Sequence, residues 1–316
     1  MRAYVYDELK APGGIREYPK PACGPDEVLV RVDVAGVNPV DWKIRAGMSG
    51  PRETPMVAGQ DVAGVAMAVG ENVTRLREGD RVVACARAHG GYAEFTVVGQ
   101  AVVGEPIATL PDGVTNEIAA TLPTPGLTAL GNLDALDVGR GTPVLILGAA
   151  GSVGRIAVQL ARERGAEIIA TIAGSGGDDV QRFGAAHIID SRDVEDVVHR
   201  VKALYPDGLP AVLDVVNDGA GLKKLAAILS PGAKILTVIH VADEPWFAQR
   251  GFTAINFALG TSPVATERGL DFLTGAIVTG KLEIRAPIER SFDDARAVLD
   301  GSASHELKGK YVLEIA

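Results

Sequence analysis

The chain has 316 residues, 47% hydrophobic and 22% charged, a composition typical of a globular protein long enough for two domains. The net charge of -9 and the lack of a Lys/Arg block argue against nucleic acid or an anionic membrane as the main partner. No apolar stretch reaches the roughly 20 residues of a membrane-spanning helix. The two cysteines, Cys23 and Cys85, provide neither a disulfide framework nor a zinc-site spacing, so we expect a cytoplasmic protein without a metal.

Residues 1–118 contain short segments with strand periodicity, separated by Gly and Pro. Val28–Val34 alternates apolar and polar residues with period two, which indicates a half-buried strand. Gly90 and Gly91 predict a turn between two later strands. The pattern predicts an antiparallel, barrel-like β domain over residues 1–118. Its other predicted strands are Asp61–Gly70, Arg81–Ala86 and Tyr92–Val98.

Residues 119–254 alternate between predicted strands and helices, which indicates a doubly wound parallel sheet, the Rossmann type of α/β fold. Ligands of such sheets bind at the carboxyl ends of the strands, so the loops there are expected to line one crevice. These loops are Gly148–Gly154, Ala173–Gly177, Val216–Asp218 and His240–Asp243. The predicted strands are Pro143–Leu147, Glu167–Ile172, Ala186–Ile189, Ala211–Val216 and Lys234–Ile239. The predicted helices are Ser152–Arg164, Asp178–Phe183, Val194–Leu204 and Leu222–Leu229.

A glycine turn joins the first of these strands to its helix and predicts a phosphate cradle. Glycines let the backbone approach a pyrophosphate, and the free N–H groups and positive dipole end of the helix face its charge. A glycine triplet alone is a weak signal, but here the strand and the helix that the motif requires are both present. We therefore predict dinucleotide binding by Ala149, Ala150, Gly151, Ser152, Val153 and Gly154.

Residues 255–316 form a third segment, with helical patterns at Gly269–Gly280 and Phe292–Leu299 and strand patterns at Arg285–Ile288 and Gly309–Ile315. We expect this segment to return to the first domain and complete it.

Several short motifs, spread over nearly the whole chain, resemble one known family as a set. They are Gly36–Lys43 with Arg45–Gly47, Gly59–Gly64, Gly79–Val82, Gly91–Phe95, Gly126–Ala129, the glycine cradle and Leu307–Lys310. The chain resembles the medium-chain dehydrogenase/reductase superfamily, in its zinc-independent NADPH:quinone oxidoreductase (zeta-crystallin-like) branch. The resemblance implies a GroES-like catalytic domain split around a Rossmann domain, and a homodimer.

Where zinc-dependent relatives carry Cys and His ligands, this chain has Asn38 and Gln60, so the resemblance implies a reductase without a metal. It also implies that Asn38 and Thr128 face the nicotinamide and the substrate. An amide and a hydroxyl can donate hydrogen bonds to a carbonyl or quinone oxygen as negative charge develops on it. From the residues alone, the favoured interpretation of Asn38 is a turn residue that ends a strand before Pro39.

Other candidates have simpler structural explanations. Asp41 caps a helix or pairs locally, Trp42 and Tyr92 pack in a core, and Asp214 is a hydrogen-bonded structural acid. Tyr92 and His89 lie beside the Gly90–Gly91 turn, where either could supply a proton. His240 ends a predicted strand and could approach the nicotinamide, but a lone histidine is usually structural. We assign no general acid and expect the proton to come from water.

The strand that ends near Ala173 has no acid for a ribose hydroxyl, and Ser175 could meet a 2′-phosphate, which favours NADPH. NADH remains possible, because Asp178 and Asp179 follow where many relatives carry Lys or Arg, and Ser191 replaces a Tyr. Both acids also suit a helix N-terminus. Arg182, Arg192 and Lys308 could supply the missing charge. We expect Asn217 and Lys308 to contact the cofactor as well.

The leading hypothesis is an NADPH-dependent oxidoreductase that transfers a hydride to a small electrophile, a quinone or an α,β-unsaturated carbonyl. One alternative is an enoyl reductase of a biosynthetic pathway. Another is an NADPH-binding redox sensor or scaffold with little turnover, against which the presence of Asn38 and Thr128 argues.

Overall fold

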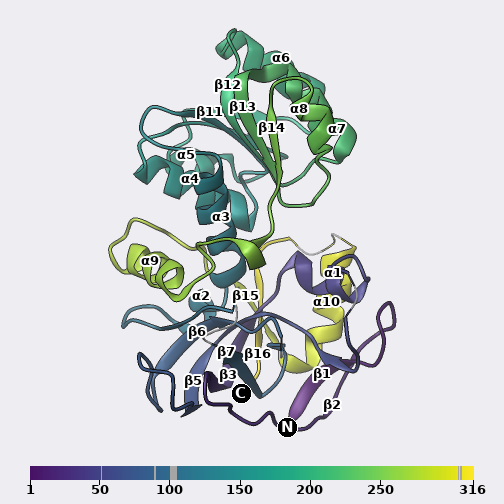
Figure 1. The fold of residues 1–316 in the computed structure, drawn as a ribbon, viewed down its shortest axis with the longest axis vertical. Helices are drawn as coiled ribbons and strands as arrows, with labels where there is room; N and C mark the ends of the chain where they lie inside the picture. The colour runs from purple at the N-terminus through teal and green to yellow at the C-terminus, as the bar shows by residue number, and fades with distance from the viewer. Residues whose placement is uncertain (51, 89, 100–104, 305, 307) are drawn as a thin grey trace. The chain divides into compact units, whose positions relative to one another are not determined.

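The computed structural model describes residues 1–50, 52–88, 90–99, 105–304, 306 and 308–316, which form two compact units. The first unit joins Met1–Leu127 to Pro263–Ala316, so both chain ends belong to it (Figure 1). The second unit is the intervening Thr128–Ser262. Helix α3 (Pro123–Ala135) runs through the residue where the first unit gives way to the second. The domain limits expected after residues 118 and 254 stay a prediction.

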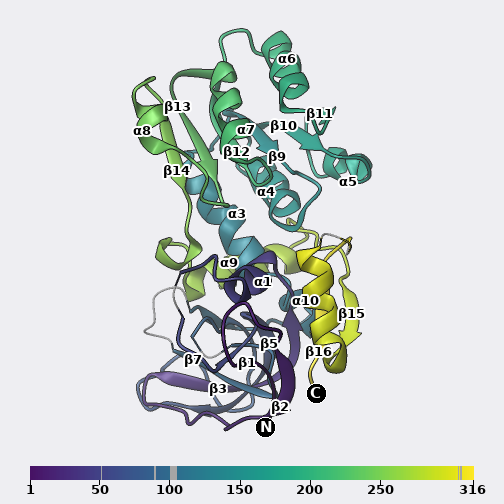
Figure 2. The same cartoon turned by 90° about the vertical axis from the view of Figure 1, so that its right-hand side faces the viewer.

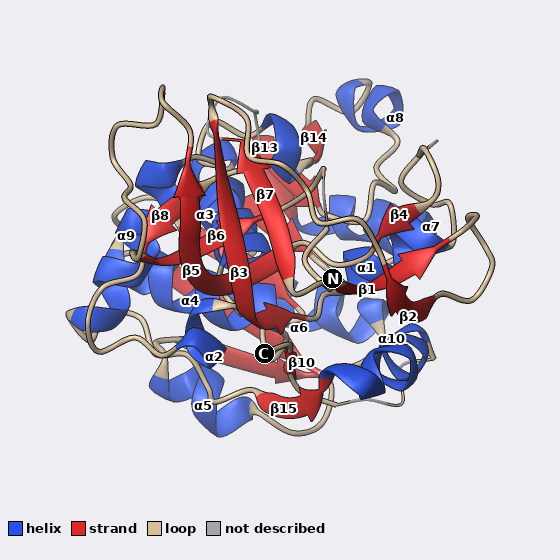
Figure 3. Cartoon of the chain, turned by 90° about the horizontal axis from the view of Figure 1, so that it is seen from below, coloured by secondary structure: helices blue, strands red, loops and turns tan. Residues whose placement is uncertain are grey.

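The first unit is built around a seven-stranded sheet in which β3 (Glu27–Gly36) is central. One edge of β3 pairs with β5 (Asp61–Val69), and the other is shared by β7 (Phe95–Gly99) and β16 (Tyr311–Glu314). Figure 3 shows β5, β3 and β7 as neighbouring arrows. The C-terminal strand therefore completes a sheet that begins near the N-terminus. The sheet also contains β6 (Arg81–Cys85), β8 (Ile107–Thr109) and β15 (Ile288–Ser291).

A smaller sheet and several helices complete this unit. Its core packs alternate residues of β3 against Tyr4, Tyr6 and apolar side chains of the C-terminal segment. The smaller sheet is formed by β2 (Gly14–Glu17), β1 (Arg2–Tyr6) and β4 (Met56–Val57). The helices are α1 (Pro39–Arg45), α2 (Asn116–Ala119), α9 (Glu267–Val278), the 3₁₀ turn Phe292–Asp294 and α10 (Ala295–Ala303).

The strand predicted at Arg285–Ile288 is wrong by three residues, because β15 starts at Ile288. Pro287 has no N–H to donate to a ladder, whereas the N–H of Ile288 donates to the carbonyl of Lys310 at 2.8 Å. The proline therefore excludes the preceding residues from the sheet.

The second unit confirms the predicted doubly wound parallel sheet, with strand order β11-β10-β9-β12-β13-β14. Figure 2 labels these strands and the helices between them. The strands are β9 (Pro143–Leu147), β10 (Glu167–Ile172), β11 (His187–Asp190), β12 (Leu209–Asp214), β13 (Leu229–Thr237) and β14 (Thr253–Asn256). The helices are α4 (Ser152–Glu163), α5 (Gly177–Arg182), α6 (Val194–Leu204), α7 (Gly219–Lys224) and α8 (Glu244–Ala248), with 3₁₀ turns at Leu225–Ile228 and Leu259–Thr261.

Several bounds in this unit differ from the prediction. Strand β13 runs from Leu229 to Thr237 rather than from Lys234 to Ile239, and α7 covers Gly219–Lys224 rather than Leu222–Leu229. The fourth strand ends at Asp214 rather than Val216, because the Asp214 carboxylate accepts the N–H groups of Val216 and Asn217 and turns the chain out of the ladder. The sixth strand, β14, is absent from the prediction, and its sequence TAIN contains two polar residues and only two apolar ones.

None of the helices in the described part of the chain is both long enough and apolar enough to cross a membrane.

Gly36, the last residue of β3, offers a test of this packing. A Cβ at this position would lie 1.9 Å from the carbonyl oxygen of Ala120 and 3.2 Å from the Cβ of Asp61. Because the first contact is with backbone, we expect Gly36→Ala to lower the free energy of unfolding by about 3 kcal/mol. Urea unfolding followed by circular dichroism measures the change.

Gly14→Ala is the matched control, since a Cβ built there would meet no heavy atom of the described residues within 4 Å beyond its chain neighbours. Equal unfolding midpoints for the two variants would contradict the packing described for Gly36.

Candidate functional site

The glycine turn after β9 is fastened to the neighbouring strand by its backbone. The N–H of Gly148 donates to Thr171 Oγ1 at 3.2 Å, and that of Ala149 donates to the Thr171 carbonyl at 2.9 Å. A Cβ on Gly154 would lie 2.3 Å from the carbonyl oxygen of Gly148, so no other residue fits there without a shift of the backbone. Gly151 is the N-cap of α4. The turn therefore presents backbone, rather than side chains, at the start of a helix.

These features fit the diphosphate of a dinucleotide. Helix α4 has 12 residues and no acid in its first turn, so its N-terminal N–H groups and dipole favour an anion. The lack of a side chain at Gly154 lets the start of α4 pack directly against the backbone of Gly148 and Ala149. The turn and the helix start thus have the geometry that the motif predicts. The role in binding stays a prediction for Ala149, Ala150, Gly151, Ser152, Val153 and Gly154.

The loops at the carboxyl ends of the strands lie beside this cradle. A Cβ on Gly148 would be 2.6 Å from Val216 Cγ1, in the loop after β12. A Cβ on Gly176, after β10, would lie 3.2 Å from the Cβ of Ala150. The structure thus brings the loops after β9, β10 and β12 together.

Asn217, a predicted cofactor contact, is held in place by Asp214 at the end of β12. The Asp214 carboxylate is fully buried and accepts Asn217 Nδ2 at 2.7 Å as well as the backbone N–H of Asn217. Asp214 is therefore the hydrogen-bonded structural acid that the sequence favoured. Burial raises its pKa to about 6, although the hydrogen bonds from Asn217 and Val216 favour the charged form.

Ser175 lies exposed between two glycines with left-handed backbone, Gly174 (φ 89°) and Gly176 (φ 107°). Sequence reasoning missed that Asp190, at the end of β11, accepts the N–H of Gly174 at 3.1 Å. Arg192 also reaches this turn, with a guanidinium nitrogen 3.9 Å from a Cβ built on Gly174. A carboxylate, Asp190, and a guanidinium, Arg192, therefore both lie beside the turn at which we predict the ribose to bind.

Arg155 joins the cradle to α5. Its Nε donates to the carbonyl of Ala150 at 2.8 Å, and its guanidinium pairs with Asp179 at 2.7 Å. Arg182 lies 3.4 Å from the same carboxylate. The hydrogen bond from Arg155 lowers the pKa of Asp179. In the sequence, Asp179 is an acid that would repel a 2′-phosphate, but in the structure its charge is compensated by Arg155.

In the first unit, Asn38 stands between β3 and α1 and belongs to a buried polar cluster. It is 3% exposed and precedes Pro39, which takes the first helical position as prolines commonly do. Its Nδ2 donates to Asp61 Oδ2 at 2.8 Å, and its Oδ1 accepts from Lys310 Nζ at 2.5 Å. Both ends of the side-chain amide are therefore engaged.

Asp61, the first residue of β5, anchors this cluster. Both of its oxygens accept the N–H of Thr124, and Oδ1 also accepts the Thr124 hydroxyl at 2.7 Å. Burial raises the pKa of Asp61, whereas Lys310 and the donors on its carboxylate lower it. Since its donors satisfy both oxygens, we assign the negative charge of the cluster to Asp61.

Asp41 is the second buried carboxyl group of the cluster. Its Oδ2 accepts the N–H of Asn38 at 2.7 Å and the hydroxyl of Tyr92 at 2.8 Å. Its Oδ1 has no hydrogen-bond partner among the described residues. Burial raises the pKa of Asp41, the hydrogen bonds from Asn38 and Tyr92 lower it, and the value is about 7. The local pairing expected for Asp41 is confirmed.

Lys310 supplies the positive charge, and sequence reasoning gave it no role beyond its place in the motif Leu307–Lys310. It is half-buried, and its ammonium also donates to the carbonyl of Val37 at 2.9 Å. Burial lowers its pKa, while Asp61 and Asp41 raise it. The available signal was a charged residue directly before the apolar strand Tyr311–Glu314.

The other predicted residues are placed as follows. Thr128 is buried on α3, in the second unit, and Lys308 is exposed in the first. His240 is exposed after β13 with φ 58°. His89 lies outside the described residues. Gln60 is 4% exposed and its carbonyl accepts the N–H of Ala86.

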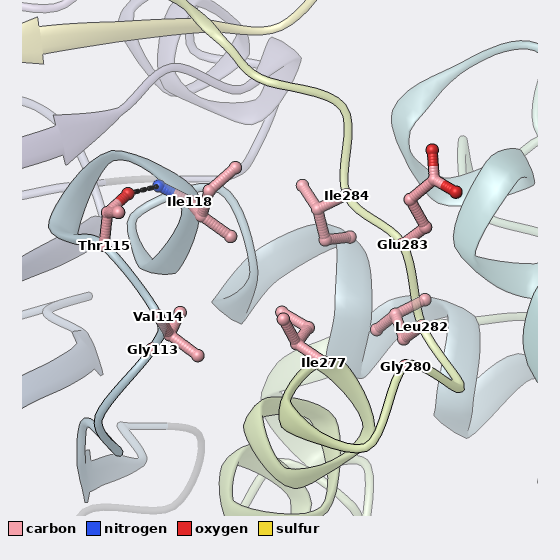
Figure 4. A pocket seen from close by; sticks show the side chains of 9 residues that line it. All are labelled: Gly113, Val114, Thr115, Ile118, Ile277, Gly280, Leu282, Glu283 and Ile284. Atoms are coloured by element: carbon pink, nitrogen blue, oxygen red, sulfur yellow. Dashed lines mark hydrogen bonds between the residues drawn. The ribbon is translucent and has the colours of Figure 1, made fainter.

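An apolar groove of about 330 Å³ also lies in the first unit (Figure 4). Among the described residues, none of the predicted site residues lines it. Its lining residues are Gly113, Val114, Thr115, Ile118, Ile277, Gly280, Leu282, Glu283 and Ile284.

Comparison with known proteins agrees with this fold. Residues 24–122 match the family model of the alcohol dehydrogenase GroES-like domain, and residues 152–247 match that of zinc-binding dehydrogenases. A chloroplast envelope quinone oxidoreductase homologue of Arabidopsis thaliana is 29% identical over 94% of this chain and 92% of its own length. The quinone oxidoreductase of Sus scrofa is 32% identical over 67% of this chain, and the match spans 64% of the pig protein. A mycobacterial structure complexed with NADPH has a TM-score of 0.85 and 28% identity, over 99% of this chain and 100% of that chain.

The chain therefore belongs to the medium-chain dehydrogenase/reductase superfamily, and it is an oxidoreductase. Within the described residues, no group of three or more His, Cys, Asp or Glu side chains is placed to hold a metal ion. Zinc independence remains a prediction, which rests on Asn38 and Gln60 at the two ligand positions.

The buried Asp214 predicts a pH-dependent stability. Its pKa is about 6 in the folded chain, against about 3.9 for an unperturbed carboxyl group, so the folded state binds this proton more tightly. The resulting stability is present below pH 4 and is lost as the pH rises through about 6. We expect the free energy of unfolding of the wild type, relative to Asp214→Asn, to fall by up to about 3 kcal/mol between pH 4 and 7.

Urea unfolding at a series of pH values measures this difference. Asp207→Asn, an exposed change in the same unit, should follow the wild-type curve. Parallel curves for the wild type and Asp214→Asn would contradict the assignment.

Proposed function

We propose that this chain binds NADPH and transfers a hydride to a quinone or another small α,β-unsaturated carbonyl compound, without a metal. The observation that carries the proposal is the cradle after β9, where tightly packed glycines open a 12-residue helix with no acid in its first turn. The NADPH-bound mycobacterial structure and the quinone oxidoreductases among the relatives support the same cofactor and substrate class.

In this proposal the diphosphate is held by Ala149, Ala150, Gly151, Ser152, Val153 and Gly154. When bound, NADPH supplies the hydride. Ser175 meets the 2′-phosphate, with Arg192 beside the same turn. Asn217 and the exposed Lys308 are further proposed contacts. The Asp190 carboxylate binds the backbone of the same turn and would suit a ribose hydroxyl better than a 2′-phosphate, so NADH is the cofactor to compare.

The chain contributes orientation and charge stabilisation to the reaction. The carbon that accepts the hydride gains two electrons, negative charge develops on the conjugated oxygen, and a proton from water completes the reduction. Asn38 is the proposed donor to that oxygen, with Thr128 as the second predicted donor. A homodimer and a cytoplasmic location also remain proposals.

Turnover tests the proposal. We expect the wild type to consume NADPH when 1,4-benzoquinone is added, with a higher kcat/KM than with NADH. Removing the amide in Asn38→Ala should lower kcat about 100-fold, the usual effect of losing a donor to a developing oxyanion, while the Kd for NADPH stays unchanged. Absorbance at 340 nm and fluorescence titration provide the two measurements.

Asn72→Ala is the control, because Asn72 is exposed and its side-chain amide donates to Asp26 at the surface. NADPH binding without turnover on quinones, enones and enoyl thioesters would favour the sensor hypothesis and overturn the proposed reaction.

A further inference from the structure

The Asn38 amide is held from both ends by charged groups of opposite sign. Asp61 accepts from Nδ2 at 2.8 Å, and Lys310 donates to Oδ1 at 2.5 Å. The assignment of the amide oxygen and nitrogen is therefore unambiguous, since the flipped amide would face an ammonium with an N–H and a carboxylate with an oxygen. The flip is opposed by both contacts at once.

The two partners of the amide are themselves fixed by the fold. Asp61 pairs with Gly36 across the β3–β5 ladder and is bound by the N–H and hydroxyl of Thr124. Lys310 precedes β16, which pairs with the same end of β3, and its ammonium also binds the carbonyl of Val37. Asn38 thus lies where three strands converge.

An asparagine amide has two N–H groups, and Asp61 takes one of them. An ammonium on the amide oxygen and a carboxylate on one N–H both polarise the group, which strengthens the hydrogen bond that the other N–H can donate. The arrangement resembles a preorganised donor, whose geometry is set before the substrate arrives.

We infer that Lys310 and Asp61 are positioning residues, which orient and polarise the Asn38 amide so that its second N–H donates to the substrate oxygen that gains negative charge. This inference rests on the proposed function. Neither Lys310 nor Asp61 touches the substrate in it, since each acts through Asn38.

Lys310→Met tests the inference because methionine is an unbranched side chain about one atom shorter than lysine and lacks its charge and donors. We expect kcat with NADPH and 1,4-benzoquinone to fall at least about 10-fold, with the Kd for NADPH unchanged, since a misplaced catalytic group costs rate rather than cofactor affinity. Lys20→Met, which changes an exposed lysine of the same unit, is the matched control. An unchanged kcat in an active, folded Lys310→Met protein would overturn the inference.

A second readout does not depend on turnover. In protein labelled with [15N]asparagine, the side-chain resonances of Asn38 are those lost in Asn38→Ser. We expect Lys310→Met to move them, whereas Lys20→Met leaves them in place. Unmoved resonances would overturn the inference even if activity changed.

The wild type gives a third readout, which holds even if Lys310→Met does not fold. Burial lowers the pKa of Lys310. The carboxyl groups that face it, Asp61 of β5 and Asp41 of α1, raise this pKa but do not cancel the effect of burial. Because the ammonium form is required, kcat should fall as the pH rises through a value below the ordinary lysine pKa of about 10.4. A kcat that stays level through that range would contradict the role of Lys310.

These outcomes separate the two proposals. If the wild type consumes no NADPH with any quinone or enone, the proposed function is wrong. If the wild type is active and Lys310→Met has the same kcat, only the positioning role is wrong.

Discussion

The first unit depends on how two buried carboxyl groups are compensated. Asp41 and Asp61 are 2% and 0% exposed, and a carboxylate left unpaired at such positions would cost several kcal/mol. Lys310 supplies one positive charge beside them, and the donors of Thr124 satisfy both oxygens of Asp61. Asp41, with its raised pKa, can remain partly protonated near neutral pH, so one ammonium suffices for the cluster. Asn38 is hydrogen-bonded to all three charged residues of the cluster, to Asp61 and Lys310 through its side-chain amide and to Asp41 through its backbone N–H.

The second unit uses backbone rather than charge. Its predicted cofactor site lies at the carboxyl ends of the parallel strands. Gly148 and Gly154 have no side chain where a Cβ would clash, and Asp214 binds the backbone of the loop that follows β12. The turn at Ser175 is less one-sided, because Asp190 binds its backbone while Arg192 approaches it. A 2′-phosphate at this turn would be attracted by Arg192 and repelled by Asp190. The preference between NADPH and NADH therefore depends on which of these two charges dominates.

Much of the fold followed from pattern. The apolar run Pro143–Leu147, the glycines after it and the helix from Ser152 were predicted at almost their observed bounds, because local periodicity and turn chemistry determine them. What escaped prediction is long-range. Lys310 meets Asn38 across 272 positions of sequence, and Asp190 meets Gly174 only because β11 lies beside β10. A single sequence carries no signal for such pairs.

The central claim is that Lys310 acts on the reaction only through Asn38, and a double-mutant cycle tests it most directly. The values of kcat/KM for the wild type, Asn38→Ala, Lys310→Met and the double variant give the coupling between the two residues. The account predicts a double variant no slower than Asn38→Ala alone, because the lysine has nothing left to position. Losses that multiply, as for two independent residues, would contradict it.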